Sequence, residues 1–300
     1  MTDVARVPER YVPEQHEISP IVYEHWHRYY FARAFSRNKV VVDIACGEGY
    51  GSQLLSGAAS YITGIDKDSE TIRVARQKYS APNLTYLEGS VTSIPLQAAV
   101  ADVVVSFETI EHVAEADQQT MFDEVRRVLK PGGIFLVSTP NLNSRFFTEG
   151  ENKFHLREFS HAEFVEFCRE RFKHVTLLGQ NLIVGSFIVT EDDFRRDSPS
   201  TIEIMNRRFA TTPECHPATA ADAKFILAAC SDGEPVKALG SLFLDGDLAL
   251  FDEFERYAAS LRASIIEMET YGKSLVEELE RMRAEAASVI EAQGQQGADV

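Results

Sequence analysis

Two carboxylates and an imidazole stand together between Glu108 and His112, in the pattern E-x-x-E-H. They directly follow the apolar run 102–107, which is typical of a buried strand. A positioned imidazole or carboxylate can take the proton of a hydroxyl nucleophile, which typically accelerates a reaction by ~10²–10⁴-fold. Two carboxylates and an imidazole can also ligate a divalent metal ion. On the alternative interpretation, Glu108 and Glu111 cap or solvate the next helix while His112 packs.

A glycine turn follows the valine-rich run 40–42, which is typical of a strand covered on both faces. Asp43 ends that run, and glycines at positions 47, 49 and 51 allow backbone angles that a side chain would forbid. Ligands of open α/β sheets bind outside the carboxyl ends of the strands, where this turn is expected. The dinucleotide pattern G-x-G-x-x-G is not fulfilled, because position 52 is a serine.

An acidic residue also closes the next predicted strand, 61–66. Asp66 comes 19 residues after Gly47, an offset at which such folds place a carboxylate that accepts hydrogen bonds from both ribose hydroxyls. An aspartate at a strand end is by itself more often a turn or helix-capping residue. The offset from the glycine turn favours the ribose interpretation.

The form D-x-A-C-G-x-G at 43–49, with L-K-P-G-G at 129–133, resembles class I S-adenosylmethionine-dependent methyltransferases. This resemblance implies S-adenosylmethionine as cofactor, with the glycine loop beside its methionyl part. Many such enzymes hold the adenine amino group with an acidic residue where this chain has Ser90, so the Ser90 side chain and the Val91 backbone remain alternatives. The cofactor-binding residues that the resemblance implies are Asp43, Ala45, Gly47, Gly49, Asp66, Ser90, Val91 and Phe107.

The E-x-x-E-H pattern resembles the same segment of ubiquinone-pathway O-methyltransferases, where it is associated with a divalent metal. The resemblance implies Glu108, Glu111 and His112 as metal ligands, and His155 as a residue that could close the set. For proton removal, His112 is the first candidate base, with Glu111 beside it. His155 is the second choice, because it lies in the aromatic-rich loop 141–160, which we interpret as a lid or acceptor wall.

The fold class that these patterns predict is α/β, Rossmann-like, with a seven-stranded, mostly parallel sheet and helices on both faces. Five βα units and two closing strands make up a domain over 21–232, preceded by an N-terminal arm, 1–20. An insertion, 181–222, is expected before the last strand, partly helical around 202–209. The expected strands are 40–43, 61–66, 84–87, 102–107, 134–138, 175–179 and 224–230, and the expected helices 21–37, 51–55, 69–78 (Ser69 as N-cap), 115–129 and 161–172.

Beyond residue 248 the pattern changes to apolar residues that alternate in steps of three and four over about four heptads. This favours a C-terminal coiled-coil helix over 248–292, although one amphipathic helix docked on the parent domain is the alternative. Gly272 occupies one seam position and weakens the helix by roughly 1 kcal/mol relative to Ala. The remaining seam residues are Leu261, Ile265, Met268, Leu275, Leu279, Met282, Ala286 and Val289.

Charge and composition narrow the range of partners. A formal net charge of −16 repels phosphate backbones, so no nucleic-acid partner is expected. The 4 cysteines form no C-x-x-C motif, which favours a reduced, cytoplasmic setting. No apolar run approaches the roughly 18 residues of a membrane span, so we expect at most peripheral membrane contact. The heptads predict a homo-oligomer or a partner enzyme bound through the coiled coil.

A narrower resemblance concerns the acceptor. The segments E-R-Y-V-P-E, E-H-W-H-R-Y and F-H-L-R-E-F resemble bacterial methyltransferases associated with surface-polysaccharide assembly, some of which carry coiled-coil tails. The resemblance implies O-methylation of a hydroxyl on a sugar or glycan, or another small-molecule acceptor. The alternatives are an O-methyltransferase for an aromatic quinone precursor and a scaffold that keeps the fold without chemistry. The intact Asp43, Gly47, Gly49 and Asp66 argue against the scaffold.

Overall fold

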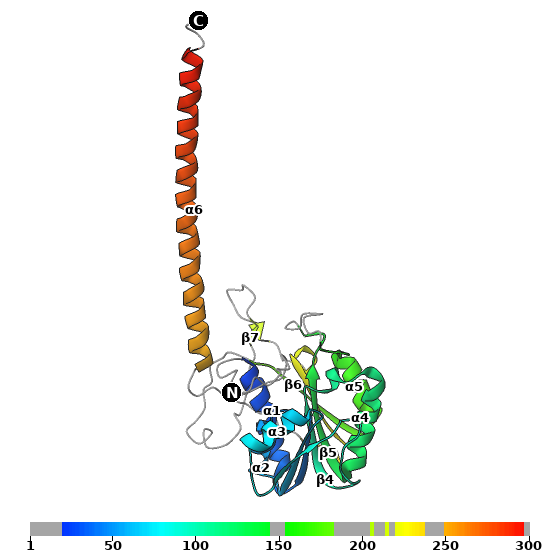
Figure 1. Ribbon diagram of the computed structural model, residues 1–300. Helices are drawn as coiled ribbons and strands as arrows, with labels where there is room; N and C mark the ends of the chain where they lie inside the picture. The colour runs from blue at the N-terminus through cyan, green and yellow to red at the C-terminus, as the bar shows by residue number, and fades with distance from the viewer. Residues whose placement is uncertain are drawn as a thin grey trace, which may run out of the picture. The chain divides into compact units, whose positions relative to one another are not determined.

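The computed structural model describes residues 20–144, 154–182, 205–206, 214–215, 220–237 and 249–296 (Figure 1). The chain divides into two units, 1–244 and 245–300. The first unit contains the sheet and its covering helices, and the second contains one long helix. Residues 1–19 of the predicted arm, 1–20, and most of the predicted insertion, 181–222, lie outside the described residues.

A seven-stranded sheet forms the centre of the first unit, and it confirms the predicted fold class. The strand order is β3-β2-β1-β4-β5-β9-β6, and β9 alone runs in the direction opposite to the other strands of this sheet. Valines fill β1 and β4, as expected of parallel strands covered on both faces. The strands are β1 Val40–Ile44, β2 Tyr61–Asp66, β3 Leu84–Glu88, β4 Ala101–Phe107, β5 Leu129–Pro140, β6 His174–Gln180 and β9 Phe225–Ser231.

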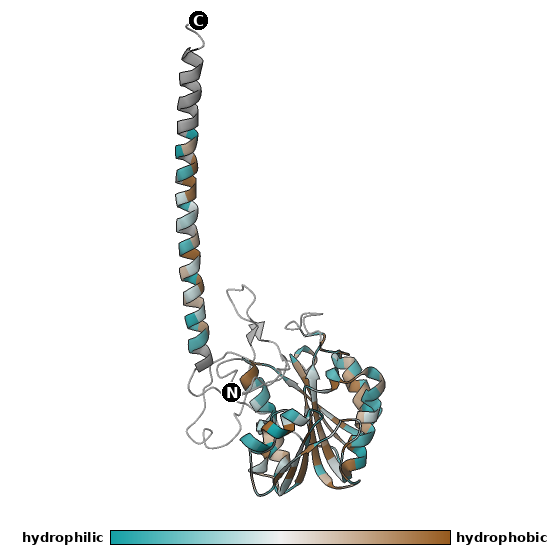
Figure 2. Ribbon diagram, in the orientation of Figure 1, coloured by the Kyte–Doolittle hydropathy of each residue, from teal (hydrophilic) through white to brown (hydrophobic). Residues whose placement is uncertain are grey.

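Two helical layers enclose this sheet. α1 (Pro20–Ser36), α2 (Tyr50–Ser56) and α3 (Ser69–Lys78) lie on one side of it, and α4 (Glu115–Val128) and α5 (His161–Arg169) on the other (Figure 1). Because strand side chains alternate between faces, Val41 packs with the α1–α2 layer while Val42 packs with the α4–α5 layer. Figure 2 shows the resulting pattern, with apolar strands between helices whose outer faces are polar.

Local differences from the prediction have identifiable causes. β5 begins at Leu129 rather than at 134, because Leu129 pairs with Ala101 before the register shifts. Asp68, not Ser69, is the N-cap of α3, and its carboxylate accepts from Glu70 N. α5 ends at Arg169, three residues before its predicted end. In the predicted insertion, Met205–Asn206 (β7) pairs with Glu214–Cys215 (β8), so the helix expected around 202–209 is wrong at β7.

The second unit contains α6 (Ala249–Gln296), a helix of 48 residues. Within it, apolar side chains of the predicted seam are exposed, among them Leu261, Ile265 and Leu275. The helix itself was predicted, and its pairing in a coiled coil remains a prediction. Among the described residues, no helix is long and apolar enough to cross a membrane.

Candidate functional site

The carboxyl edge of the sheet brings the glycine turn and Asp66 together. β1 and β2 are parallel neighbours, so the residues that follow them meet at this edge. Gly47 N donates a hydrogen bond of 3.0 Å to Asp66 Oδ2, and Asp68 N donates one of 3.0 Å to Oδ1. A carboxylate oxygen has two lone pairs, so it can accept more than one hydrogen bond. Asp66 therefore faces the glycine turn, and its contact with a ribose stays a prediction.

The turn owes its shape to left-handed backbone angles. Gly47 has φ 56° and Gly49 has φ 89°, and Ala45 adopts φ 59° without being a glycine. A Cβ atom added to Gly49 would lie 2.5 Å from Tyr86 Oη, and that hydroxyl donates to Gly49 O over 2.9 Å. Gly49 is therefore required by packing against Tyr86 as well as by its backbone angle.

Asp43 is buried behind the turn and fastens it to two helices. Its Oδ2 accepts 2.6 Å from Ser52 Oγ in α2, and its Oδ1 accepts 3.2 Å from Tyr29 Oη in α1. Burial raises the pKa of Asp43 from 3.8 to about 7, although these hydrogen bonds oppose the shift. Asp43 thus connects β1 with α1 and α2, and its contribution to cofactor binding stays a prediction.

The other predicted cofactor residues differ in their surroundings. Ser90 Oγ lies 2.8 Å from Thr92 Oγ1, at the carboxyl end of β3. Val91 packs against the core cluster on the α4–α5 side. The Phe107 ring is buried, with its centroid 5.2 Å from that of Tyr29. The side chains of Val91 and Phe107 therefore pack in the core, and the adenine contact of Ser90 or of the Val91 backbone stays a prediction.

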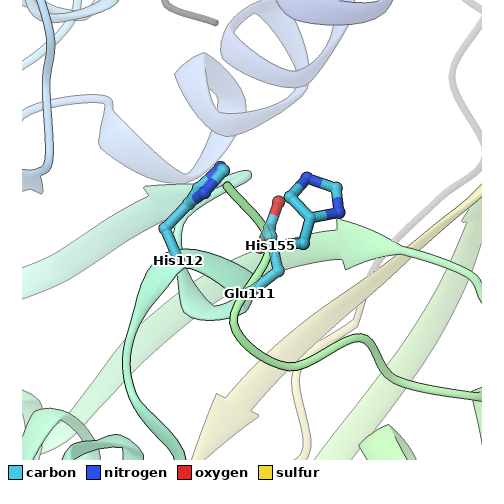
Figure 3. Close-up of side chains that lie close together, drawn as sticks. All are labelled: Glu111, His112 and His155. Carbon is cyan, nitrogen blue, oxygen red and sulfur yellow. The ribbon is translucent and has the colours of Figure 1, made fainter. Parts of the chain in front are cut away.

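A second group of functional side chains lies on the same edge of the sheet, beyond β4. The ligand atoms of Glu111, His112 and His155 lie within 4.8 Å of one another (Figure 3). Glu111 and His112 belong to the 3₁₀ turn η2 (Ile110–His112), which follows β4. His155 comes from the segment 154–160, and its ring centroid is 5.0 Å from that of His112. A carboxylate and two imidazoles form a donor set that suits Zn²⁺ and similar divalent ions.

Backbone contacts hold the His155 segment against the turn η2. Leu156 N and Arg157 N both donate to Glu111 O, over 2.7 and 3.2 Å. His112 Nδ1 lies 3.1 Å from Phe154 O, and His155 Nδ1 lies 2.9 Å from Glu158 Oε1. The predicted grouping of Glu111 and His112 with His155 therefore has a defined backbone frame.

Glu108 does not belong to the group of ligand atoms that the described residues bring together. It adopts φ 51°, a strained value for a residue other than glycine. Its Oε1 accepts 2.6 Å from Ser138 Oγ and lies 3.8 Å from Arg28 Nη1. Among the described residues, the ligand atoms that lie together are those of Glu111, His112 and His155, so metal binding by Glu108, Glu111 and His112 stays a prediction.

The carboxyl group of Glu111 is the most strongly perturbed acid of this region. Burial raises the pKa of Glu111 well above its usual range, and the charge of Glu108 raises it further. The hydrogen bond of 3.2 Å from Thr139 Oγ1 and the charge of Arg28 oppose this shift. A metal ion bound here would have to displace a proton from Glu111.

Sequence analysis missed a buried ionic group beside this cluster. Glu24 and Arg28 of α1 are 4% and 1% exposed, and Lys224 Nζ lies 2.6 Å from Glu24 Oε1. Charged residues in a helix are usually solvated, so the residue types of Glu24 and Arg28 did not indicate that they are buried. Their spacing of four, continued by the buried Ala32, was the available signal, because it places them on one helix face.

Comparisons with known proteins agree with this geometry. Residues 42–137 match the family model of a methyltransferase domain. A Mycolicibacterium smegmatis protein named "Probable S-adenosylmethionine-dependent methyltransferase" is 42% identical over 130 residues, which cover 42% of this chain and 48% of that protein. A ubiquinone biosynthesis O-methyltransferase of Haemophilus ducreyi is 33% identical over 110 residues, which cover 34% of this chain and 46% of that protein.

A solved structure gives a more distant likeness. A chain of the complex between the Haloferax volcanii Trm112 methyltransferase activator and a methyltransferase is 21% identical, with a TM-score of 0.48, over 70% of this chain and 91% of that chain. The chain spans about half the length of the curated relatives that it matches. Residues 42–137 of the first unit thus resemble a methyltransferase domain, and the sheet that contains them has a Rossmann-like fold.

Proposed function

We propose that this protein transfers a methyl group from S-adenosylmethionine to a hydroxyl of a sugar or glycan. The observation that best supports methyl transfer is the hydrogen bond from Gly47 N to Asp66 Oδ2, because it joins a ribose-binding carboxylate to the glycine turn. The acceptor class rests on the sequence resemblance of the flanking segments. The proposed setting is the cytoplasm, in keeping with the free thiols of Cys46, Cys168 and Cys230.

The residues divide into two roles. S-adenosylmethionine, when bound, supplies an activated methyl group on a sulfonium. Asp66 accepts hydrogen bonds from the ribose hydroxyls, and the backbone of Gly47 and Gly49 borders the methionyl part. On the acceptor side, His112 takes the proton of the attacking hydroxyl, with Glu111 and His155 as the alternative bases. Holding donor and acceptor in line contributes a large share of the acceleration.

A divalent metal at the acceptor side is a second proposal for the same cluster. Glu111, His112 and His155 offer ligand atoms within 4.8 Å of one another. A bound cation would lower the pKa of a coordinated hydroxyl, so that the proton leaves more readily. Under this proposal the cluster binds the acceptor oxygen through the metal, and Glu108 stays outside the ligand set.

Calorimetry with S-adenosylmethionine tests the proposed function first. The wild-type chain is expected to bind, and Asp66→Ala to lose that binding; absence of wild-type binding would contradict methyl transfer. The acceptor is tested by mass spectrometry of cell-envelope glycans from a strain that lacks this protein. A glycan that lacks one methyl group is expected, and unchanged glycans would exclude this acceptor class.

An aromatic quinone precursor is the alternative acceptor. The E-x-x-E-H segment and the similarity to ubiquinone biosynthesis O-methyltransferases favour it. Metal-dependent methylation of a catechol by the purified chain would support this alternative over the glycan. Any turnover on either acceptor removes the third interpretation, a scaffold without chemistry.

The long helix α6 is proposed to mediate self-association. Its seam residues Leu261, Ile265 and Leu275 are 46%, 51% and 42% exposed, a cost that pairing with a second helix would remove. Sedimentation of the full chain is expected to give an oligomer that Ile265→Asp dissociates. Thr270→Asp, which adds the same charge off the seam, is the matched control. A wild-type monomer would favour the alternative, pairing with a partner enzyme.

A further inference from the structure

Arg28 is a buried arginine whose guanidinium is only partly satisfied. Its Nη1 donates 2.8 Å to Gln180 Oε1 and lies 3.8 Å from Glu108 Oε1. The group also lies over the Phe225 ring, 4.8 Å from its centroid. Nε and Nη2 are buried and have no hydrogen-bond partner among the described residues. An unsatisfied buried donor is costly, so these two N–H groups call for an acceptor.

The two unsatisfied nitrogens form one edge of the guanidinium. Nε–H and Nη2–H point in the same direction, and this fork matches the two oxygens of a carboxylate. Other arginines of this chain use the same edge on an oxygen acceptor: Arg73 on Glu70, Arg76 on the Tyr86 carbonyl, Arg126 on Asp232 and Arg127 on Glu124. The Nε–Nη2 edge of Arg28, called the Arg28 fork below, thus has the geometry for a bidentate contact, and no described residue supplies its acceptor.

The groups around the Arg28 guanidinium come from one half of the sheet. Gln180 ends β6 and Phe225 begins the antiparallel β9, so both lie at the carboxyl edge of the sheet. These strands belong to the β4–β6 half of the sheet, whereas the glycine turn follows β1. Glu108, which follows β4, connects Arg28 with the Glu111 cluster. The fork therefore belongs to the acceptor side of the site.

The surrounding charges favour a singly charged ligand. Lys224 pairs with Glu24 at 2.6 Å, and Arg28 is nearest to Glu108. The formal charges of these four groups sum to zero. The surroundings therefore carry no excess positive charge that would stabilise a doubly charged phosphate. A carboxylate adds one negative charge and engages both donors of the fork.

We propose that the Nε–Nη2 edge of Arg28 binds a carboxylate of the methyl acceptor, which would make that acceptor an acidic sugar such as a uronic acid. The inference rests on the proposed function for the identity of the acceptor as a sugar. The bidentate contact fixes the sugar ring at one end, so that a hydroxyl at the other end faces the Glu111–His112–His155 cluster. Arg28 is then a residue that determines acceptor specificity.

The test uses three probes on one sugar ring and the ¹⁵N-labelled full chain. D-glucuronate carries the carboxylate, D-glucose lacks it, and glucose 6-phosphate carries a phosphate instead. The Arg28 Nε–H resonance is expected to shift saturably with glucuronate and to remain in place with glucose. Arg28→Lys keeps the charge but removes the fork, and it is expected to weaken glucuronate binding at least about tenfold in calorimetry. Arg33→Lys, on the exposed face of α1, is the matched control.

Other outcomes would overturn the inference. A resonance unmoved by millimolar glucuronate means that water satisfies the fork, and stronger binding of glucose 6-phosphate through Arg28 means a phosphate ligand. A shift caused by S-adenosylmethionine alone assigns the fork to the carboxylate of the cofactor. If Arg28→Lys does not fold, the wild-type resonance still decides. Failure of the wild-type chain to bind S-adenosylmethionine would refute the proposed function, whereas the glucuronate result is judged independently of it.

Discussion

The proposed cofactor side and the proposed acceptor side of this site are built in different ways. The cofactor side, around Gly47 and Asp66, consists of short-range backbone hydrogen bonds between neighbouring strands. The acceptor side gathers Arg28, Glu111 and His155 from parts of the chain that are far apart in sequence. Its groups include a carboxyl with a raised pKa and a guanidinium with unsatisfied donors. We interpret the difference in terms of the two ligands. Backbone hydrogen bonds fix the position of the cofactor, whereas side chains with unsatisfied polar groups select an acceptor whose own polar groups can pair with them.

The largest expected effect is on the cofactor side. Asp66→Ala removes both acceptors for the ribose hydroxyls. Two hydrogen bonds to a charged group, at up to about 3 kcal/mol each, predict binding of S-adenosylmethionine that is weaker by up to about 10⁴-fold. Calorimetry measures this loss. Asp68→Ala is the control, because it removes the N-cap of α3, at a cost of about 1 kcal/mol in stability, and is expected to keep cofactor affinity. Equal losses in both variants would mean that Asp66 acts through the fold alone.

The next effect concerns the base. His112→Gln is expected to lower the rate of methyl transfer by ~10²–10⁴-fold while cofactor affinity is unchanged, because only the proton acceptor is lost. The rate is measured with unmethylated glycan from the strain that lacks this protein. His174→Gln, at the opposite end of the sheet, serves as control. A rate that survives His112→Gln but falls in Glu111→Gln would transfer the role to Glu111.

Metal affinity distinguishes the ligand set predicted from the sequence from the residues that the structure brings together. We expect His155→Ala to weaken Zn²⁺ binding by about tenfold or more, since even outer-sphere partners of metal ligands contribute that much. Glu108→Gln is expected to change it less than His155→Ala does, because Glu108 is hydrogen-bonded to Ser138 and acts on Glu111 through its charge. Wild-type affinity should rise with pH as Glu111 loses its proton. The reverse ranking of the two variants, measured by calorimetry, would favour the set that contains Glu108.

The smallest effect is on stability. Asp43 has a pKa of about 7 in the folded chain and 3.8 without its surroundings, so folding favours its protonated form. Its contribution to stability is fully present below pH 3.8 and is lost as the pH rises through about 7. Asp43→Asn should show a flatter dependence over this interval in urea unfolding at several pH values. An identical slope in both proteins would mean that Asp43 is ionised throughout.

Most of the fold could be predicted because its signals are local. The valines of β1 and β4 and the glycine turn specify a buried parallel sheet whatever the rest of the chain does. The boundaries that were missed depend on neighbours, as where Ala101 extends β5 back to Leu129. Helix α3 illustrates a smaller ambiguity, since Asp68 and Ser69 are both good caps and only one can hold the position.

Some parts of the candidate site could be predicted from the sequence and others could not. Asp66 followed from its offset to Gly47, because the offset reflects one βαβ unit. The contact of Glu108 with Ser138 is made from a backbone with φ 51°, and no residue type predicts that angle. Arg28 and Glu24 are ordinary helix residues until β6 and β9 close over them, an event that only the complete sheet determines.

The carbonyl of Glu111 has a consequence of its own. The amide groups of Leu156 and Arg157 both donate to this carbonyl. Glu111, whose carboxyl group has a raised pKa, therefore also holds the segment that carries His155. Displacing that segment would withdraw an imidazole and rehydrate the acid in a single movement. The proton affinity of the site and the docking of this segment are then thermodynamically linked, so that each reports on the other.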